Sequence, residues 1–172
     1  AGRAIDDRLA EEKGKYRLPD GFKKSAVLFN LDRAKEHAGR RLIVVEGYVD
    51  VIAMVTAGFA GAVAPLGTAL TENQLALLWK MADEPILCFD GDNAGQRAAA
   101  RAADRAVPLL KPGLSLRFAW MPAGEDPDSL VRAKGAAHAD EALVGQHPQD
   151  SRLRADRHIG HFIKIKRAAV GQ

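Results

Sequence analysis

Residues 42–57 read LIVVEGYVDVIAMVTA, and this stretch decides the fold class. Its first four residues are a mostly β-branched apolar run, which is typical of a strand buried on both faces. Glu46 and Gly47 end the run, and a helix is predicted from Val49 to Ala57, where Gly58 stops it. A buried strand followed directly by a helix is the unit from which parallel sheets are built.

The same alternation of strand and helix continues as far as residue 135. Further strands are predicted at Ala60–Leu66, Ile86–Phe89 and Leu114–Trp120. Helices are predicted from Thr71 to near Ala82, from Asn93 to Leu110 and from Pro127 to near Gly135, with one more at Ser25–His37 before the first strand. Thr71 and Gln74 have the spacing of a capping box. This order predicts an α/β domain with a mostly parallel four-stranded sheet, right-handed crossovers and helices on both faces.

The composition fits one such domain with flanking segments. The chain has 172 residues, of which 47% are hydrophobic, so it can form a core and global disorder is not expected. No apolar run approaches the about 20 residues of a membrane helix, and residues 1–10 lack the apolar centre of a signal peptide. The single cysteine, Cys88, excludes an internal disulfide and a cysteine-based zinc site. We therefore expect a cytoplasmic protein without a membrane partner.

Charge is distributed unevenly along the chain. Residues 42–135 contain 11 Asp and Glu against 8 Lys and Arg, whereas residues 1–41 contain 11 Lys and Arg against 7 Asp and Glu. An acidic centre beside a basic flank suits a metal site next to a surface that binds a polyanion. At these magnitudes, however, the charge pattern alone favours random surface variation.

Acidic residues follow three of the four predicted strands. They are Glu46 and Asp50 after the first strand, Asp90 and Asp92 after the third, and Glu125, Asp126 and Asp128 after the fourth. The carboxyl ends of parallel strands share one edge of the sheet, where ligands bind, so we expect these acids to converge. Clustered carboxylates repel one another, and oxygen ligands without His or Cys favour Mg²⁺ or Mn²⁺ over zinc. In the alternative interpretation Asp92 and Asp126 only cap helices, which leaves Glu46 unexplained.

Basic residues form a second group of candidates. Lys15, Lys23 and Lys24 lie close in sequence to Tyr16 and Phe22, and cations interleaved with rings suit single-stranded nucleic acid. A solvated basic loop explains these residues equally well. Arg97, on the predicted helix after Asp92, is placed to reach a phosphate at the acidic site, and a solvated helix arginine is the alternative.

Four motifs in this order resemble those of the bacterial DnaG-type DNA primases. They are Glu46-Gly47-Tyr48-Val49-Asp50 (E-G-Y-x-D), Leu66-Gly67-Thr68-Ala69 (the L-G-T turn), Asp90-Gly91-Asp92-x-x-Gly95 (the D-x-D Toprim signature) and Gly124-Glu125-Asp126-Pro127-Asp128 (G-x-D-P-D). The resemblance covers residues 40–135 and implies the Toprim fold, with a Rossmann-like sheet. It implies that Glu46, Asp90 and Asp92 are catalytic metal ligands. It further implies that Asp50, Asp126 and Asp128 complete the site or hold a second ion.

The resemblance also implies a function, namely synthesis of short RNA primers on single-stranded DNA by a nucleotidyltransferase. The implied partners are a single-stranded DNA template and ribonucleoside triphosphates, with a replicative helicase as a further candidate, and the implied cofactor is Mg²⁺ or Mn²⁺. Lys15-Tyr16 and Phe22-Lys23-Lys24 resemble the family's basic segment, shortened as in primase-like proteins of plasmids and integrated elements. Two other functions stay open: strand cleavage by a nuclease or topoisomerase-like Toprim protein, and a non-catalytic nucleic-acid-binding module.

The resemblance finally predicts a domain organisation. Residues 1–40 are expected to be the C-terminal part of the basic primase core, residues 41–135 the Toprim domain, and residues 136–172 a helical or irregular extension. The family's zinc-binding module has no counterpart in this sequence. We therefore expect the chain to be a fragment of a longer protein.

Overall fold

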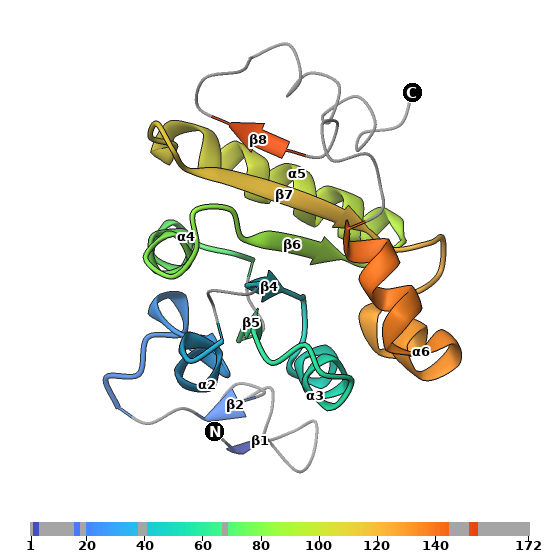
Figure 1. Cartoon of the computed structure of the whole chain (residues 1–172). Coiled ribbons are helices and arrows are strands. Elements are labelled where there is room, and N and C mark those ends of the chain that lie inside the picture. The colour runs from blue at the N-terminus through green and yellow to red at the C-terminus, as the bar shows by residue number, and fades with distance from the viewer. Residues whose placement is uncertain are drawn as a thin grey trace.

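A six-stranded sheet with the order β3-β5-β4-β6-β7-β8 organises the chain (Figure 1). The computed structural model describes residues 2–3, 16–17, 20–37, 41–66, 69–144 and 152–154. The four central strands are parallel, and they are β4 (Ile43–Val44), β5 (Ala62–Pro65), β6 (Ile86–Phe89) and β7 (Ser115–Trp120). The predicted α/β class and the four predicted parallel strands are therefore confirmed.

Two short antiparallel strands extend this sheet at its edges, and sequence analysis missed both. β3 (Leu28–Phe29) pairs with β5, and β8 (Arg152–Arg154) pairs with β7. Two further strands, β1 (Gly2–Arg3) and β2 (Tyr16–Arg17), form a separate two-stranded antiparallel sheet. With two or three residues each, these four strands are too short to show a strand periodicity of their own, whereas β4, equally short, lies within the apolar run at residues 42–45.

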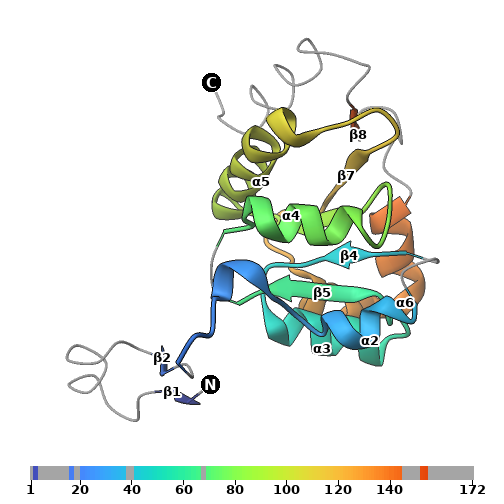
Figure 2. The ribbon, with the colours of Figure 1, turned by 90° about the vertical axis from the view of Figure 1, so that its left-hand side faces the viewer.

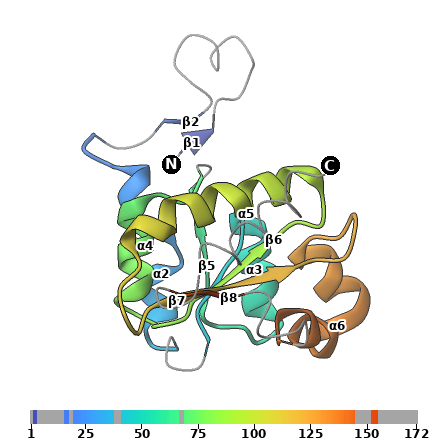
Figure 3. The ribbon, with the colours of Figure 1, turned by 90° about the horizontal axis from the view of Figure 1, so that it is seen from above.

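Helices cover both faces of the sheet, as predicted (Figures 2 and 3). The described helices are α2 (Leu31–Lys35), α3 (Tyr48–Thr56), α4 (Glu72–Trp79), α5 (Asn93–Ala106) and α6 (Pro127–Val144). α4 and α5 lie on one face, and α3 and α6 lie on the other. None of the helices in the described ranges has the length and apolar character of a membrane span.

Each face of the sheet has its own apolar core, because successive strand residues point to opposite faces. Val44 and Leu87 pack in the core under α4 and α5, whereas their neighbours Ile43 and Cys88 pack in the core under α3 and α6. The helices contribute Leu75, Leu78, Ala99 and Ala103 to the first core and Val51, Met54, Leu130 and Leu143 to the second. Burial on both faces explains why the strand sequences are continuous apolar runs.

The connections create a switch point between β4 and β6. The chain leaves β4 through α3 to reach β5 on one side of β4, and it later returns to form β6 on the other side. Ile43 and Val44 pair with Ile86 and Leu87, so β4 ends two residues before β6, and Glu46 follows β4 near the point where Asp90 follows β6. In open α/β sheets ligands bind beyond the carboxyl ends of such a pair. The topology therefore predicts a ligand site at the residues that follow β4 and β6.

The predicted helix Ser25–His37 is wrong. The segment forms a 3₁₀ turn, η1 (Lys24–Ala26), then β3 and the short helix α2. Asn30 separates β3 from α2 with a left-handed φ of 63°, and its side-chain Nδ2 donates to the Ala62 carbonyl at 2.9 Å. Backbone pairing of β3 with β5 overrides the local helical pattern, and the paired residues are 35 and 37 positions apart in sequence.

Helix ends differ from the predictions in two other places. Gly135 interrupts α6 with a φ of 79°, but the helix resumes and reaches Val144. α5 ends at Ala106 and continues as a 3₁₀ turn, η2 (Val107–Leu109), which contains Pro108. The L-G-T turn is only partly visible, because Gly67 and Thr68 lie outside the described residues. The three predicted domain boundaries stay predictions, although β3 carries residues before 41 into the sheet.

Candidate metal centre

The predicted acidic residues meet at the carboxyl edge of the sheet. Glu46 follows β4, Asp90 and Asp92 follow β6, and Asp126 precedes α6 in the loop after β7. The backbone N–H of Asp90 donates to Oε1 of Glu46 at 3.3 Å, which joins the ends of β4 and β6 directly. The predicted convergence of Glu46 with the Asp90 pair is confirmed.

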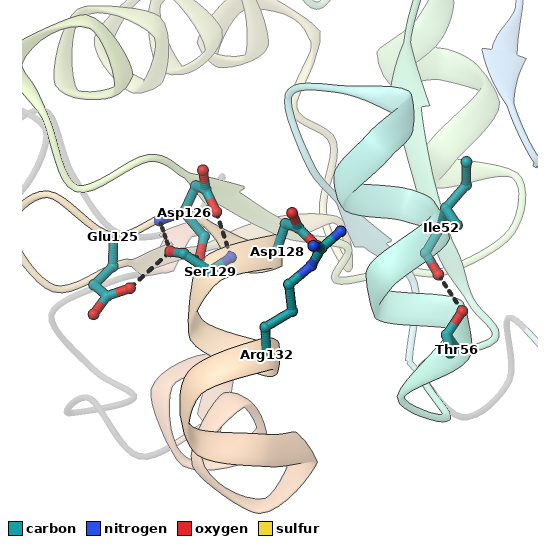
Figure 4. A network of polar contacts seen from close by, with 7 residues as sticks. All are labelled: Ile52, Thr56, Glu125, Asp126, Asp128, Ser129 and Arg132. Carbon is teal, nitrogen blue, oxygen red and sulfur yellow. Dashed lines mark hydrogen bonds and ion pairs between the residues drawn. The ribbon is translucent and has the colours of Figure 1, made fainter.

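Three of these acids also cap the helices that begin at this edge. Asp50 Oδ2 accepts from Gly47 N at 3.0 Å, Asp92 Oδ1 from Gly95 N at 2.7 Å, and Asp126 Oδ1 from Ser129 N at 2.6 Å (Figure 4 shows the last of these). Asp92 and Asp126 therefore do cap helices, as the alternative interpretation of these two acids predicts. Each of these caps uses one of the two carboxylate oxygens, so capping and metal binding are compatible. The caps also fix these side chains at the ends of α3, α5 and α6.

Asp128 connects α6 with α3. Its Oδ1 accepts from Nε of Arg132 at 2.7 Å, one helical turn further along α6 (Figure 4). Its backbone N–H opposes the rise in the pKa of Asp50, whose carboxyl group lies at the start of α3. Asp128 therefore shares its negative charge with Arg132, and its backbone favours the ionised form of Asp50.

Asp90 is the acid whose surroundings are least favourable. Its Oδ1 is buried and accepts no hydrogen bond from the described residues. Burial, followed by the negative charge of Glu46 and then those of Asp50, Asp126 and Asp92, raises the pKa of Asp90 to about 7. A buried carboxylate oxygen without a partner is rare in folded proteins, and it points to an ion or ligand.

Two of its neighbours, Glu46 and Asp50, share this electrostatic strain. Burial raises the pKa of Glu46, an effect opposed by the Asp90 amide and reinforced by the charges of Asp92 and Asp50. Burial likewise raises the pKa of Asp50, although the Gly47 amide opposes the change. The site thus concentrates partly desolvated charge of one sign, which a bound cation stabilises.

Two glycines make the tight turn after β6 possible. A Cβ atom on Gly91 would lie 1.9 Å from the Pro122 carbonyl oxygen, and one on Gly95 would lie 2.2 Å from the Asp90 carbonyl oxygen. Both contacts are with backbone, so neither can be relieved by a side-chain rotation. Gly91 N also donates to the Glu125 carbonyl at 2.9 Å, which fastens this turn to the loop before α6. Only glycine allows these segments to approach so closely.

The donor chemistry of the site fits a hard divalent cation. The acids supply only oxygen, and Asp90 Oδ1 is the buried atom without a partner. Within the described ranges, no three Asp, Glu, His or Cys side chains are already arranged as a complete ligand set. The fit therefore rests on the type and burial of the donors.

The predicted basic residues have different positions. Lys23 is exposed and Lys24 is half-buried, both at η1. Because β3 is antiparallel to β5, with Leu28 opposite Pro65, the segment before β3 lies at the carboxyl edge of the sheet, as the acids do. Arg97 is exposed on α5. Lys15 lies outside the described residues.

Sequence analysis missed one residue at this edge, Arg101. It is exposed on α5, and its positive charge opposes, in small part, the rise in the pKa of Glu46 that burial causes. Together with Glu46 it lines a cavity of about 270 Å³. Its spacing of four from Arg97, which places both on one helix face, was the signal available in the sequence.

Comparison with known proteins agrees with this geometry. Residues 40–119 match the model of the Toprim domain. The DNA primase of Neisseria meningitidis is 43% identical over 150 residues, which cover 84% of this chain and 25% of that protein. A DNA primase domain from Pseudomonas aeruginosa superimposes with a TM-score of 0.72 at 40% identity, covering 87% of this chain and 47% of that one. A DnaG primase catalytic domain bound to ssDNA gives a TM-score of 0.72 at 38% identity, covering 81% and 47%.

A parallel sheet with acids at the β4–β6 switch point, matched by the Toprim model, defines a Toprim protein. Within that class the similarity to primases extends well beyond the Toprim match. The chain belongs to the bacterial DnaG-type DNA primase family, and the resemblance seen in its motifs is confirmed. It spans about a quarter of the length of the curated relative and just under half of the two solved domains.

Proposed function

We propose that this chain is the Toprim part of a primase catalytic core, which makes short RNA primers on single-stranded DNA from ribonucleoside triphosphates. The observation that carries the proposal is the buried, unpartnered Oδ1 of Asp90 beside Glu46 at the switch point. Metal-dependent nucleotidyl transfer is a chemistry that needs such a site. The relatives' name, DNA primase, selects this reaction among those that Toprim sites perform.

The acids have distinct proposed roles. Glu46, Asp90 and Asp92 bind Mg²⁺ or Mn²⁺ directly, and Asp50, Asp126 and Asp128 complete the site or hold a second ion. A bound divalent cation supplies charge neutralisation at the α-phosphate and the leaving pyrophosphate. The chain's own contribution is to fix the carboxylates: the Asp90 amide holds Glu46, and the α5 cap holds Asp92.

Partners follow from the same proposal. Lys23, Lys24 and Arg97 bind template phosphates, and the first two lie at the same sheet edge as the acids. One similar solved domain is described as bound to ssDNA, which supports a DNA template here. Lys15, a replicative helicase and a cytoplasmic location stay part of the proposal, without support from the described residues.

The deciding experiment separates capping from metal binding at Asp92. Asp92→Asn keeps an efficient N-cap but removes the charge, whereas Asp92→Ala removes both. In the full-length protein, Asp92→Asn and Glu46→Gln should each lower primer synthesis at least about 100-fold without lowering the melting temperature. Asp92→Ala should lower both. Asp83→Asn, an exposed acid just before β6 at the opposite edge, is the matched control.

The same assay distinguishes the other two functions. A nuclease or topoisomerase-like protein would cleave strands in a metal-dependent way and lose cleavage in these variants. A non-catalytic module would show neither activity, and its affinity for nucleic acid would tolerate Glu46→Gln. Normal primer synthesis by the Asp92→Asn and Glu46→Gln proteins would show that the active site lies elsewhere.

A further inference from the structure

A cavity of about 270 Å³ opens beside the acidic residues on the α5 side of the sheet. The carboxyl ends of β4, β5 and β6 form one wall, and α5 forms the other. Most of its lining is small or apolar, including Val45, Pro65, Phe89, Ala98 and Ala102. Two charged residues also line it, Glu46 and Arg101, and they carry opposite charge. Glu46 therefore belongs both to the metal site and to this cavity.

Arg101 is available to bind a ligand, whereas Arg105, one turn further along α5, already binds the backbone. Nη1 of Arg105 donates to the Leu70 carbonyl at 2.6 Å, so Arg105 holds the loop before α4. Among the described residues, Arg101 makes no hydrogen bond or ion pair, and its side chain is exposed. Arg101 and Glu46 both line the cavity, so a guanidinium and a metal-site carboxylate border the same space.

The chemistry of the lining selects the ligand. A guanidinium binds phosphate oxygens in pairs, and a carboxylate binds phosphate only through a cation. A ligand that satisfies both is a polyphosphate chelating a divalent ion. The small apolar side chains that line the walls suit a sugar ring. The cavity volume is below the range of about 300–1,000 Å³ that is typical of sites for whole ligands, so the cavity holds only part of a nucleotide. A base would then remain outside, where it can pair with a template.

We propose that Arg101 and this cavity bind the ribose and triphosphate of a nucleoside triphosphate whose cation is held by Glu46, Asp90 and Asp92. The inference rests on the proposed function, because it assumes that a cation binds to these acids. It adds a phosphate-binding residue and a sugar subsite to that function. Because the base lies outside, binding is independent of which base the nucleotide carries.

The test is calorimetry on this chain with three probes: Mn²⁺ alone, preformed Mn²⁺–ATP and preformed Mn²⁺–inorganic triphosphate. Arg101→Ala should weaken binding of both phosphate complexes about tenfold or more, since hydrogen bonds to charged groups are lost. Binding of Mn²⁺ alone should be unchanged or tighter, because a positive charge near Glu46 has been removed. Arg101→Lys should fall between wild type and Arg101→Ala. The matched control, Arg33→Ala, removes an exposed arginine from α2 and should change nothing.

A second variant tests the sugar subsite. Ala98→Leu narrows the cavity and keeps a good helix former in α5. It should weaken Mn²⁺–ATP and Mn²⁺–CTP equally, about tenfold, and leave Mn²⁺–inorganic triphosphate unaffected. A loss that extends to inorganic triphosphate, or that differs between ATP and CTP, would refute the sugar subsite.

The outcomes separate this inference from the proposed function. If wild type binds Mn²⁺–ATP and Arg101→Ala binds it equally well, Arg101 is not the phosphate ligand and the inference fails alone. If wild type binds Mn²⁺ but not Mn²⁺–ATP, the inference also fails while the metal site stands. If Mn²⁺ itself does not bind, the metal site and the inference fail together. Opposite changes for Mn²⁺ and Mn²⁺–ATP in Arg101→Ala support the inference, because misfolding would weaken both.

Discussion

Asp90→Asn should stabilise the fold in the absence of divalent metal, although it removes a proposed ligand. The pKa of Asp90 rises from 3.8 to about 7 on folding, which is roughly three pKa units. At about 1.4 kcal/mol per unit, an isolated, fully buried group would cost about 4 kcal/mol when ionised. Asp90 is only partly buried, so solvent screening reduces this figure. We expect Asp90→Asn to add about 1–2 kcal/mol to the free energy of unfolding at pH 8.

The sign of the pH dependence follows from linkage. Asp90 has a raised pKa in the folded state, so well below pH 4 it is protonated whether the chain is folded or not, and its burial then adds no electrostatic cost. As pH rises from about 4 to about 7, the unfolded chain ionises Asp90 more readily, and the folded state is progressively destabilised. Above pH 7 the cost is complete. The stability difference between Asp90→Asn and wild type should therefore grow between pH 5 and pH 8.

Urea unfolding followed by circular dichroism measures this difference at both pH values, with and without Mn²⁺. Saturating Mn²⁺ should make wild type more stable than Asp90→Asn, because the ion binds the folded wild-type protein much more tightly than it binds the folded variant. Asp83→Asn, which changes an exposed acid at the other edge of the sheet, should follow wild type throughout. A variant that is less stable than wild type at pH 8 without metal would refute the electrostatic reasoning. An unchanged order in Mn²⁺ would place the ion elsewhere.

Three further predictions concern the surroundings of the site. Gly95→Ala should destabilise the fold by about 1–3 kcal/mol, measured by thermal unfolding, because the added Cβ would meet the Asp90 carbonyl oxygen. This cost should exceed the gain from the higher helix propensity of alanine. A gain in stability would show that the contact relaxes. Thr71→Ala should cost about 1 kcal/mol in urea unfolding, since Thr71 Oγ1 accepts from Gln74 N at 3.2 Å, and an unchanged midpoint would contradict the capping box. Lys23→Ala should weaken binding of single-stranded DNA, measured by fluorescence anisotropy, and the number of ions released on binding, taken from the salt dependence of the affinity, should fall by about one. Equal salt slopes for the variant and the wild type would show that Lys23 does not contact the DNA.

The sequence by itself determined the central part of this protein. Apolar runs such as Ile86–Phe89 are long enough to identify strands, and the alternation with helices implies a parallel sheet. Parallel strands end at one edge, so the positions of Glu46 and Asp90 after their strands were sufficient to predict that they converge. The capping box of Thr71 and Gln74 is also local, and both of its hydrogen bonds were predicted correctly.

Only the tertiary structure decided the features that depend on distant partners. β3 exists because its backbone pairs with β5, and no periodicity within Ser25–His37 reveals this pairing. The buried, unpartnered Oδ1 of Asp90 and the cavity under Arg101 arise where β4, β6 and α5 meet, and their burial depends on packing between these elements. Sequence fixes which groups are available along the chain. Packing alone decides which of them lose water and which remain without a partner, and therefore which can bind a ligand.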